Sequence, residues 1–327
     1  MPEPAVQRPR GPSTRRIGFA MALGAGICWG TTGPLSTALY AEGAALTAVG
    51  FWRIAFGGAA LLAWAALFRR DLFDVDRRGL LLVGLLGGAC VAGFEVAYQF
   101  AIAGVGVAGA AALLYTAPVL VAFAARIVLG EALTPLRVLL AAGVMIGAAL
   151  TVRGGTGVEG LFTSREEGVL LGVAGGLCAA ASYAGTTLIG RWAVPRYGAL
   201  RVLWMEIAGG TALLAVVLPL AGETPTIPSG AGAWLYIGLL AAATVVAANV
   251  LFFGALKRVE AAPVSVAATI EPVAGAALAL ALLGQRLTAL GWAGLALVVL
   301  SVAVGYLTEG VRRRSTERPA DPRTAAR

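Results

Sequence analysis

Ten apolar stretches, each about 20 residues long, recur along this chain of 327 residues. A helix of that length spans the roughly 30 Å hydrocarbon core of a bilayer. The stretches are too long and too continuous for the strands of a transmembrane barrel, in which apolar and polar residues alternate over about ten residues. They cover residues 17–39, 46–68, 79–99, 105–129 and 136–152, and then residues 167–190, 200–220, 234–254, 261–283 and 289–307. The sequence therefore predicts an all-α polytopic membrane protein with ten transmembrane helices.

The composition excludes the main alternatives. Charged residues make up 13% of the chain, about half the share typical of soluble domains, and hydrophobic residues make up 59%. A folded soluble protein needs a polar surface, so these proportions exclude a soluble enzyme and a disordered protein. Arginines before residue 17 resemble the start of a secretory signal. The apolar run continues through Trp29 to Pro34 without a clear cleavage signal, which predicts an uncleaved first helix.

The basic residues indicate the orientation. If the N-terminus is cytoplasmic, all but four of the 25 Lys and Arg residues lie in cytoplasmic connections or in the two tails. The four others are Arg53, Arg153, Arg165 and Arg286. This positive-inside bias predicts that both termini are cytoplasmic. The net charge of +8 then follows from topology and requires no nucleic-acid partner. One Lys against 24 Arg, with abundant Ala and Gly, indicates a GC-rich bacterial source and hence the bacterial cytoplasmic membrane.

Signals of enzymes and metal sites are weak. The three cysteines, Cys28, Cys90 and Cys178, fall in apolar stretches and suit helix packing better than a disulfide or a metal site. The chain has no histidine. Three aspartates between residues 71 and 76 superficially resemble a magnesium–diphosphate motif, but flanking arginines favour a self-neutralising loop. No Gly-Lys phosphate-binding loop occurs. We therefore predict no enzymatic activity, no metal and no cofactor.

The two halves of the chain repeat each other. A shift of 154 residues places Gly84 on Gly238, Pro118 on Pro272 and Thr134 on Thr288. The predicted repeats span residues 17–152 and 167–308, with an external linker at 153–166 and cytoplasmic tails at 1–16 and 309–327. Five helices are an odd number, so the second repeat enters the membrane from the opposite side. Such inverted repeats are typical of secondary transporters. Duplication in a channel or a structural membrane protein is the alternative.

Several short motifs resemble the EamA-type repeat of the drug/metabolite transporter superfamily. They are Cys28-Trp29-Gly30, Trp52-Arg53 and Glu271-Pro272, together with the run Leu129 to Thr134 and its counterpart Leu283 to Thr288. The resemblance covers residues 17–307 and implies a ten-helix carrier of small metabolites with both termini in the cytoplasm. Two positions depart from the pattern. Gln285 replaces the usual Glu, and Ala117 stands where the first repeat could carry an acid matching Glu271.

Four charged residues lie well inside the apolar stretches: Arg53, Glu95, Glu206 and Glu271. A charge within a bilayer costs about 2.5–3.5 kcal/mol on insertion scales and needs a reason. Arg53 and Glu95 lie at similar depth and are predicted to pair, either as a structural ion pair or to hold a substrate's carboxylate and ammonium. Glu206 either faces the cavity near Asn249 or reaches a basic residue at the interface. Glu271, nearest the midplane, is either a candidate for proton coupling, as is Glu95, or a packing residue.

Prolines, aromatic residues and amides complete the predicted site. Pro118 and Pro272 each free the carbonyl four residues earlier, so their helices should face a cavity or each other and are candidate hinges. Thr134 and Thr288 suit the N-caps of the helices that follow. Besides Arg53, Glu95 and Glu271, the predicted substrate-binding residues are Trp29, Tyr98, Gln99, Tyr115, Tyr183 and Asn249, and Trp204 is a further candidate for the cavity wall. Tyr and Trp also favour the membrane interface, which is the alternative for each.

These features predict a secondary transporter that moves a small metabolite, amino acid or drug by alternating access, with export as the favoured direction. The predicted partners are a small-molecule substrate, the lipid bilayer and protons, and a homodimer is compatible with the sequence. The alternative is a non-transporting scaffold or a channel-like protein. Saturable flux with counterflow distinguishes a carrier from a channel, whose current follows the voltage.

Overall fold

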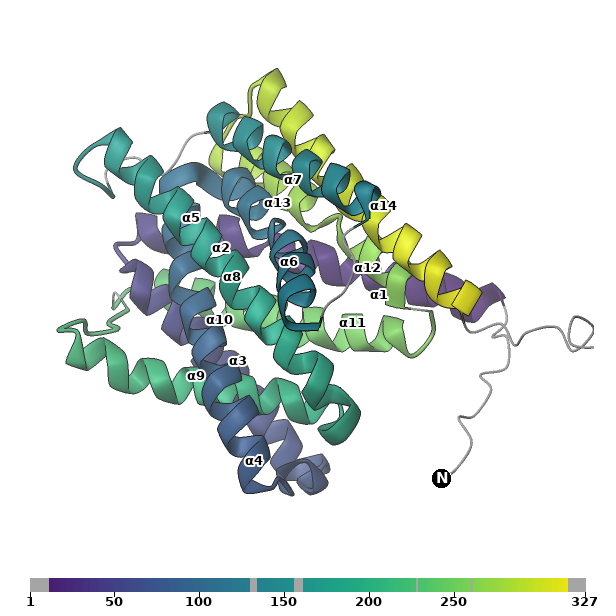
Figure 1. Cartoon of the computed structure of the whole chain (residues 1–327). Coiled ribbons are helices and arrows are strands. Elements are labelled where there is room, and N and C mark those ends of the chain that lie inside the picture. The colour runs from purple at the N-terminus through teal and green to yellow at the C-terminus, as the bar shows by residue number, and fades with distance from the viewer. Residues whose placement is uncertain (1–11, 130–133, 156–160, 228, 260, 317–327) are drawn as a thin grey trace, which may run out of the picture.

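The structure is a computed structural model, and it describes residues 12–129, 134–155, 161–227, 229–259 and 261–316. All regular secondary structure in these ranges is helical, as expected (Figure 1). The first half contains α1 (Pro12–Gly30), α2 (Thr32–Ala41), α3 (Leu46–Phe68), η1 (Arg70–Phe73), α4 (Arg77–Gly79), η2 (Leu80–Gly87), α5 (Gly88–Leu114), α6 (Ala117–Leu129) and α7 (Pro135–Gly154). The second contains α8 (Arg165–Tyr197), α9 (Ala199–Leu220), α10 (Ala231–Ala241), η3 (Ala242–Ala247), α11 (Ala248–Leu256), α12 (Ala261–Ala268), α13 (Glu271–Leu283) and α14 (Ala289–Thr316).

Helices long enough to cross a membrane dominate the fold. Within the described ranges, six helical segments have the length and apolar character of a membrane span, and two shorter apolar helices accompany them. One segment, Arg77–Val121, joins parts of two predicted stretches. The predicted boundary between those stretches falls close to Gly106, whose φ of 76° interrupts the helical geometry of α5. The first predicted stretch is divided between α1 and α2, which meet at Thr31.

Small residues bring helices from the two halves into close contact. Helix α5 packs along α8, and α7 packs along α14 (Figure 1). A Cβ atom added to Gly104 would lie 2.1 Å from the Gly168 carbonyl oxygen, and one added to Gly147 would lie 2.7 Å from that of Gly294. Close approach of backbones at small residues is a common way for membrane helices to associate, because lipid provides no hydrophobic drive between helices. The two halves therefore pack closely against each other along these helix pairs.

Capping interactions fix the ends of several helices. Helix α7 begins at Pro135, directly after Thr134, as predicted. The predicted N-cap of α14 is confirmed, since the Thr288 hydroxyl accepts a hydrogen bond from the Gly291 N–H at 3.2 Å. Gln285 has a capping role as well: its Oε1 accepts from the Val107 N–H at 3.3 Å, directly after Gly106. The Leu129 to Thr134 motif of the first repeat lies mostly outside the described residues.

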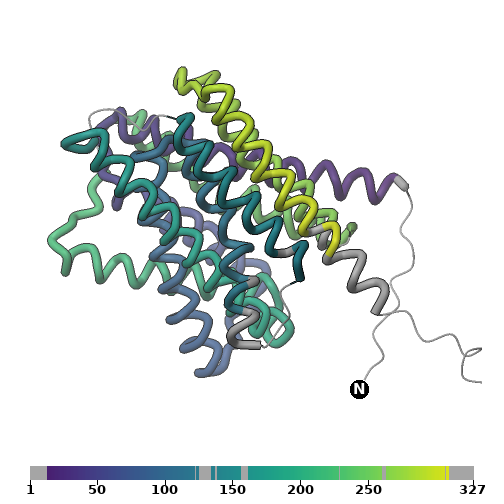
Figure 2. The backbone as a smooth tube through the Cα atoms, turned by 45° about the horizontal axis from the view of Figure 1, so that its top comes forward, coloured from purple at the N-terminus to yellow at the C-terminus, as the bar shows by residue number. Residues whose placement is uncertain are grey.

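The loop between α3 and α4 is self-neutralising, as predicted. Arg69 forms an ion pair with Asp71 at 2.8 Å. The Tyr197 hydroxyl donates to Asp76 at 2.7 Å, and the Trp204 indole N–H donates to the Leu72 carbonyl at 2.9 Å. These bonds attach the loop to the end of α8 and the start of α9. Figures 1 and 2 place the start of α1 and the last described turns of α14 at the same end of the molecule.

Candidate functional site

A central cavity of about 360 Å³ lies between the two halves. Its walls come from α1, α2, α3, α5 and α6 of the first half and from α8, α9, η3, α11, α12 and α13 of the second. The polar and charged lining residues are Trp29, Thr32, Arg53, Glu95, Tyr98, Tyr115, Tyr183, Thr186, Glu206, Thr244, Asn249, Ser265, Thr269 and Glu271. The remainder of the wall is mainly aliphatic and aromatic.

Arg53 and Glu95 form a buried, two-bonded ion pair at the cavity wall. The Arg53 Nε donates to Glu95 Oε2 at 2.7 Å, and its Nη2 donates to Oε1 at 2.6 Å. The residues are 7% and 3% exposed. Arg53 also contacts the Thr32 hydroxyl at 3.4 Å and lies 5.6 Å from the centre of the Phe94 ring. The predicted pairing of these two residues is thus present, and the guanidinium is surrounded by hydrogen-bond acceptors and one aromatic face.

Glu271 joins two helix breaks. Helix α5 ends at Leu114 and α6 begins at Ala117, while α12 ends at Ala268 and α13 begins at Glu271. The two breaks are related by the same shift of 154 residues that relates the repeats. The Tyr115 hydroxyl, in the first break, donates to Glu271 Oε2, next to the second break, at 3.2 Å. The two interrupted helices therefore meet across the cavity.

Each predicted hinge proline follows one of these breaks. Pro118 and Pro272 are the second residues of α6 and α13. A proline is tolerated in the first turn of a helix because the missing N–H has no partner there anyway. The residues four positions earlier, Leu114 and Ala268, both line the cavity, as expected for carbonyls released in lipid. The prolines thus start new helices rather than bending continuous ones.

Glu206 is the least satisfied charged group in the cavity. The residue is 9% exposed, and its Oε1 is buried without a hydrogen-bond partner among the described residues. Asn249, from α11, lines the same cavity, and its amide donates to the Val245 carbonyl at 2.8 Å. Glu206 makes no ion pair with Arg201 or Lys257 within the described chain. Of the two alternatives for Glu206, the cavity position is the one observed.

Aromatic side chains form much of the remaining wall. Phe94 stacks on Tyr98 with ring centroids 5.3 Å apart, and Trp29 contacts Phe252 at the same separation. The Trp29 indole N–H donates to the Thr244 carbonyl at 3.1 Å, across the two halves. Rings of this kind offer flat faces to apolar or cationic ligands.

Two of the aromatic and amide residues singled out in the sequence lie elsewhere. Gln99 is fully buried and does not line the cavity; its Oε1 accepts from the Tyr40 hydroxyl at 2.6 Å. Trp204 faces the α3–α4 loop and does not line the cavity either. The other predicted binding residues, Trp29, Arg53, Glu95, Tyr98, Tyr115, Tyr183, Asn249 and Glu271, all meet at the cavity.

Several small polar residues of the cavity wall were not predicted from the sequence. Thr32, Thr244 and Thr269 lie in the wall, and each hydroxyl donates to a carbonyl of the preceding helical turn. Threonine is common in membrane helices for that reason, so the residue type alone gave no signal. The position of Thr244 opposite Trp29 depends on the fold. In the described part of the chain no three His, Cys, Asp or Glu residues are grouped as metal ligands would be.

The fold and this cavity define a class of protein: a polytopic helical membrane protein with a charged central cavity between two halves. Residues 16–153 and 170–307 each match the EamA-like transporter family. The chain belongs to that family, which confirms the resemblance predicted from its short motifs. The family is one of transporters rather than enzymes.

One curated protein and one solved structure are similar to this chain over most of its length. An uncharacterized transporter of Bacillus subtilis (strain 168), YwfM, is 29% identical over 303 residues, which cover 90% of this chain and 95% of YwfM. A crystal structure of a protein that is 21% identical has a TM-score of 0.59 and covers 94% of this chain and 100% of its own. At that identity the similarity concerns the fold alone.

Proposed function

We propose that this protein is a secondary transporter that carries a small metabolite, amino acid or drug across a bacterial cytoplasmic membrane by alternating access, in the direction of export. The observation that carries the proposal is the central cavity, because both halves line it and it holds charged groups that a bilayer-embedded scaffold has no reason to keep. The proposed topology has ten membrane helices in two inverted repeats, residues 17–152 and 167–308, with both termini cytoplasmic.

The charges of the cavity favour a substrate that carries an ammonium group. One guanidinium and three carboxyl groups line the wall, and Arg53 is already bonded twice to Glu95. Glu206 and Glu271 then have no basic partner among the described lining residues. An ammonium beside Glu206 would satisfy its open oxygen, and the Phe94, Tyr98 and Phe252 rings suit an apolar or aromatic remainder. Small organic amines, including amino acids, fit this description.

The remaining roles follow from the positions of the residues. Arg53 and Glu95 would hold the substrate's charged groups when the pair opens. Glu271, bonded to Tyr115 between the two breaks, would couple transport to protons, with Glu95 as the second candidate. Pro118 and Pro272 would mark the hinges about which the packing rocks.

Transport in proteoliposomes tests the proposal. We expect saturable uptake with counterflow for organic amines in a panel of amino acids, purines, sugars, polyamines and lipophilic cations. Glu206→Gln should lower amine transport at least tenfold, because it removes the charge and keeps the size. Glu166→Gln is the matched control, since Glu166 is exposed and lies outside the cavity lining. Linear, voltage-following flux in the wild-type protein would instead indicate a channel.

Proton coupling has its own test. Glu271→Gln should abolish the dependence of transport on an imposed pH gradient while leaving counterflow at equal pH measurable. An unchanged response to the gradient would show that Glu271 does not couple transport to protons, and Glu95 would then be the remaining candidate.

A further inference from the structure

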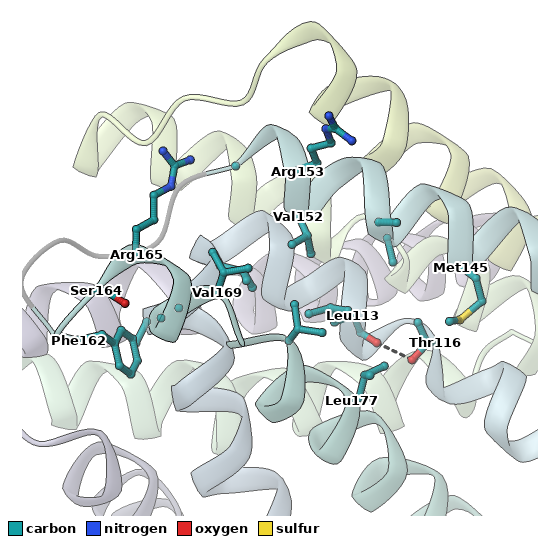
Figure 3. Close-up of a pocket in the computed structure, with 18 residues that line it drawn as sticks. Leu113, Thr116, Met145, Val152, Arg153, Phe162, Ser164, Arg165, Val169 and Leu177 are labelled. Carbon is teal, nitrogen blue, oxygen red and sulfur yellow. Dashed lines mark hydrogen bonds between the residues drawn. The ribbon is translucent and has the colours of Figure 1, made fainter. Parts of the chain in front are cut away.

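A second and larger cavity, of about 860 Å³, opens between α5, α7 and α8 (Figure 3). We call it the α5–α7–α8 groove. The break between α5 and α6 separates it from the central cavity: Leu113 and Thr116 line the groove, whereas Leu114 and Tyr115 line the central cavity. The residues proposed for transport therefore take no part in it.

The groove has the depth of one lipid leaflet. Along α8 its lining runs from Arg165 to Leu177, twelve residues or about 18 Å. Along α7 it runs back from Arg153 to Met145, eight residues or about 12 Å. Half of a typical hydrocarbon core is about 15 Å. The groove thus extends from the helix ends, where the membrane surface is expected, to about the midplane.

The groove wall is mainly apolar, and part of it is exposed. Met145, Val169 and Leu177 line it and are 48%, 38% and 40% exposed. The described chain leaves a large part of each of these side chains uncovered. In a membrane, lipid acyl chains cover an apolar surface of this kind.

The charge is confined to one end of the groove. Arg153, one residue before the end of α7, and Arg165, the first residue of α8, are both exposed, and Figure 3 shows both guanidinium groups at the same end. The neighbouring acids do not compete there. Neither Glu166 nor Glu167 lines the groove, and Glu167 is bonded back to the N–H and hydroxyl of Thr163. No described acidic residue lines this groove.

We propose that the α5–α7–α8 groove binds one anionic glycerophospholipid of the surrounding leaflet. Arg153 and Arg165 hold its phosphate, and one acyl chain lies along Val169, Val173 and Leu177. Guanidinium groups suit phosphate because their planar donors bind two oxygens at once. The lipid site requires only that the chain is embedded in a membrane. It does not depend on which substrate is carried or on the direction of transport.

Lipid titration of the delipidated full-length protein, followed by native mass spectrometry, tests the site. Dioleoylphosphatidylglycerol should bind with one tight site, and dioleoylphosphatidylcholine more weakly. In the variant Arg153→Gln/Arg165→Gln the affinity for the anionic lipid should fall about 25-fold, because each arginine near a lipid surface contributes about fivefold. Arg16→Gln/Arg77→Gln is the matched control, since it removes two exposed arginines that lie outside the groove.

A second variant tests the acyl chain without touching the charges. Ala149 is exposed and lines the groove, so the larger ring in Ala149→Trp should block the path of the acyl chain and abolish tight lipid binding while both arginines remain. Equal binding of the two lipids by the wild-type protein, or tight binding retained in either variant, would overturn the proposal. Sodium phosphate should not bind measurably at the same concentration, and an affinity equal to that of the lipid would show a phosphate site without a lipid. These comparisons stand even if the double variant fails to fold, because the wild type and Ala149→Trp decide them.

Discussion

Arg53 and Glu95 form a buried ion pair, and replacing one partner should lower the free energy of unfolding by a different amount than replacing the other. Glu95→Met leaves a guanidinium in the membrane interior that cannot lose its charge at any accessible pH. An unpaired arginine there costs about 3 kcal/mol on insertion scales, and breaking a buried pair costs roughly 3–5 kcal/mol in soluble proteins. Arg53 is 7% exposed and gives both of its short bonds to Glu95, so Glu95→Met removes both of them from a buried guanidinium. We expect Glu95→Met to lower the free energy of unfolding by about 3 kcal/mol.

Arg53→Met should cost less, about 1–2 kcal/mol. The carboxyl that it leaves can take up a proton and persist as a neutral group, so the penalty is that of an unsatisfied polar side chain. The double variant Arg53→Met/Glu95→Met removes both charges and replaces them with flexible apolar side chains. It should lie within about 1 kcal/mol of the wild type, because a buried pair and an apolar replacement are often similar in stability.

Unfolding in mixed micelles, followed by tryptophan fluorescence against the fraction of denaturing detergent, measures the four proteins of this cycle. The exposed pair of Arg69 and Asp71, at 2.8 Å, gives the control: Asp71→Asn should leave the midpoint unchanged. If Glu95→Met is no less stable than Asp71→Asn, an unpaired Arg53 carries no penalty in this site. If the double variant is no more stable than Glu95→Met, the two residues are not energetically coupled, and the predicted cycle is wrong.

Three further predictions concern packing, pH and capping. Gly104→Ala should destabilise the protein by about 1–3 kcal/mol in the same unfolding assay, because a Cβ would lie 2.1 Å from the α8 backbone. Gly190→Ala is the control: Gly190 has open space around it, so the substitution should be neutral or stabilising. Hydrogen bonds from the Tyr197 hydroxyl and a backbone N–H hold the pKa of Asp76 below its ordinary value. The stability that Tyr197→Phe loses at neutral pH should therefore shrink as the pH falls below about 4, because Asp76 then becomes protonated. Unfolding midpoints measured against pH test this. Thr288→Ala should cost about 1 kcal/mol by removing the N-cap of α14, again from the unfolding midpoint, and an unchanged midpoint would contradict the capping role.

The positions of the helices were largely predictable because hydrophobic length determines them. The stretch 46–68 is α3 with the same bounds, and the stretch 136–152 lies within α7, Pro135–Gly154. The exceptions are interruptions made by the backbone. Thr31 divides the first stretch, and helix α5 continues through the connection expected between residues 99 and 105 to Gly106, where φ is 76°. Apolar content is continuous across both positions, so no pattern of hydrophobicity could reveal them.

The depth of the site residues in the membrane was predictable from the sequence, but the direction of each side chain around its helix axis was not. Tyr98 and Gln99 follow Glu95 by three and four residues, and successive residues turn about 100° around a helix. Their side chains therefore lie about 60° to one side of Glu95 and about 40° to the other. Tyr98 faces the cavity, while Gln99 faces Tyr40 on α2. The sequence cannot distinguish these two directions, because both residues share the broad polar side of the helix and only the position of α2 separates them.

Two glycines of α1 lie against the break between α12 and α13. In the structure they admit the α12–α13 break: a Cβ added to Gly26 would lie 2.7 Å from the Ala268 carbonyl oxygen, and one added to Gly30 would lie 2.9 Å from that of Glu271. Helix α1 thus covers the backbone where the regular hydrogen bonds of α12 and α13 stop. In lipid an exposed carbonyl at that point would cost several kcal/mol, so a movement about this break has to carry α1 with it or admit water from the cavity.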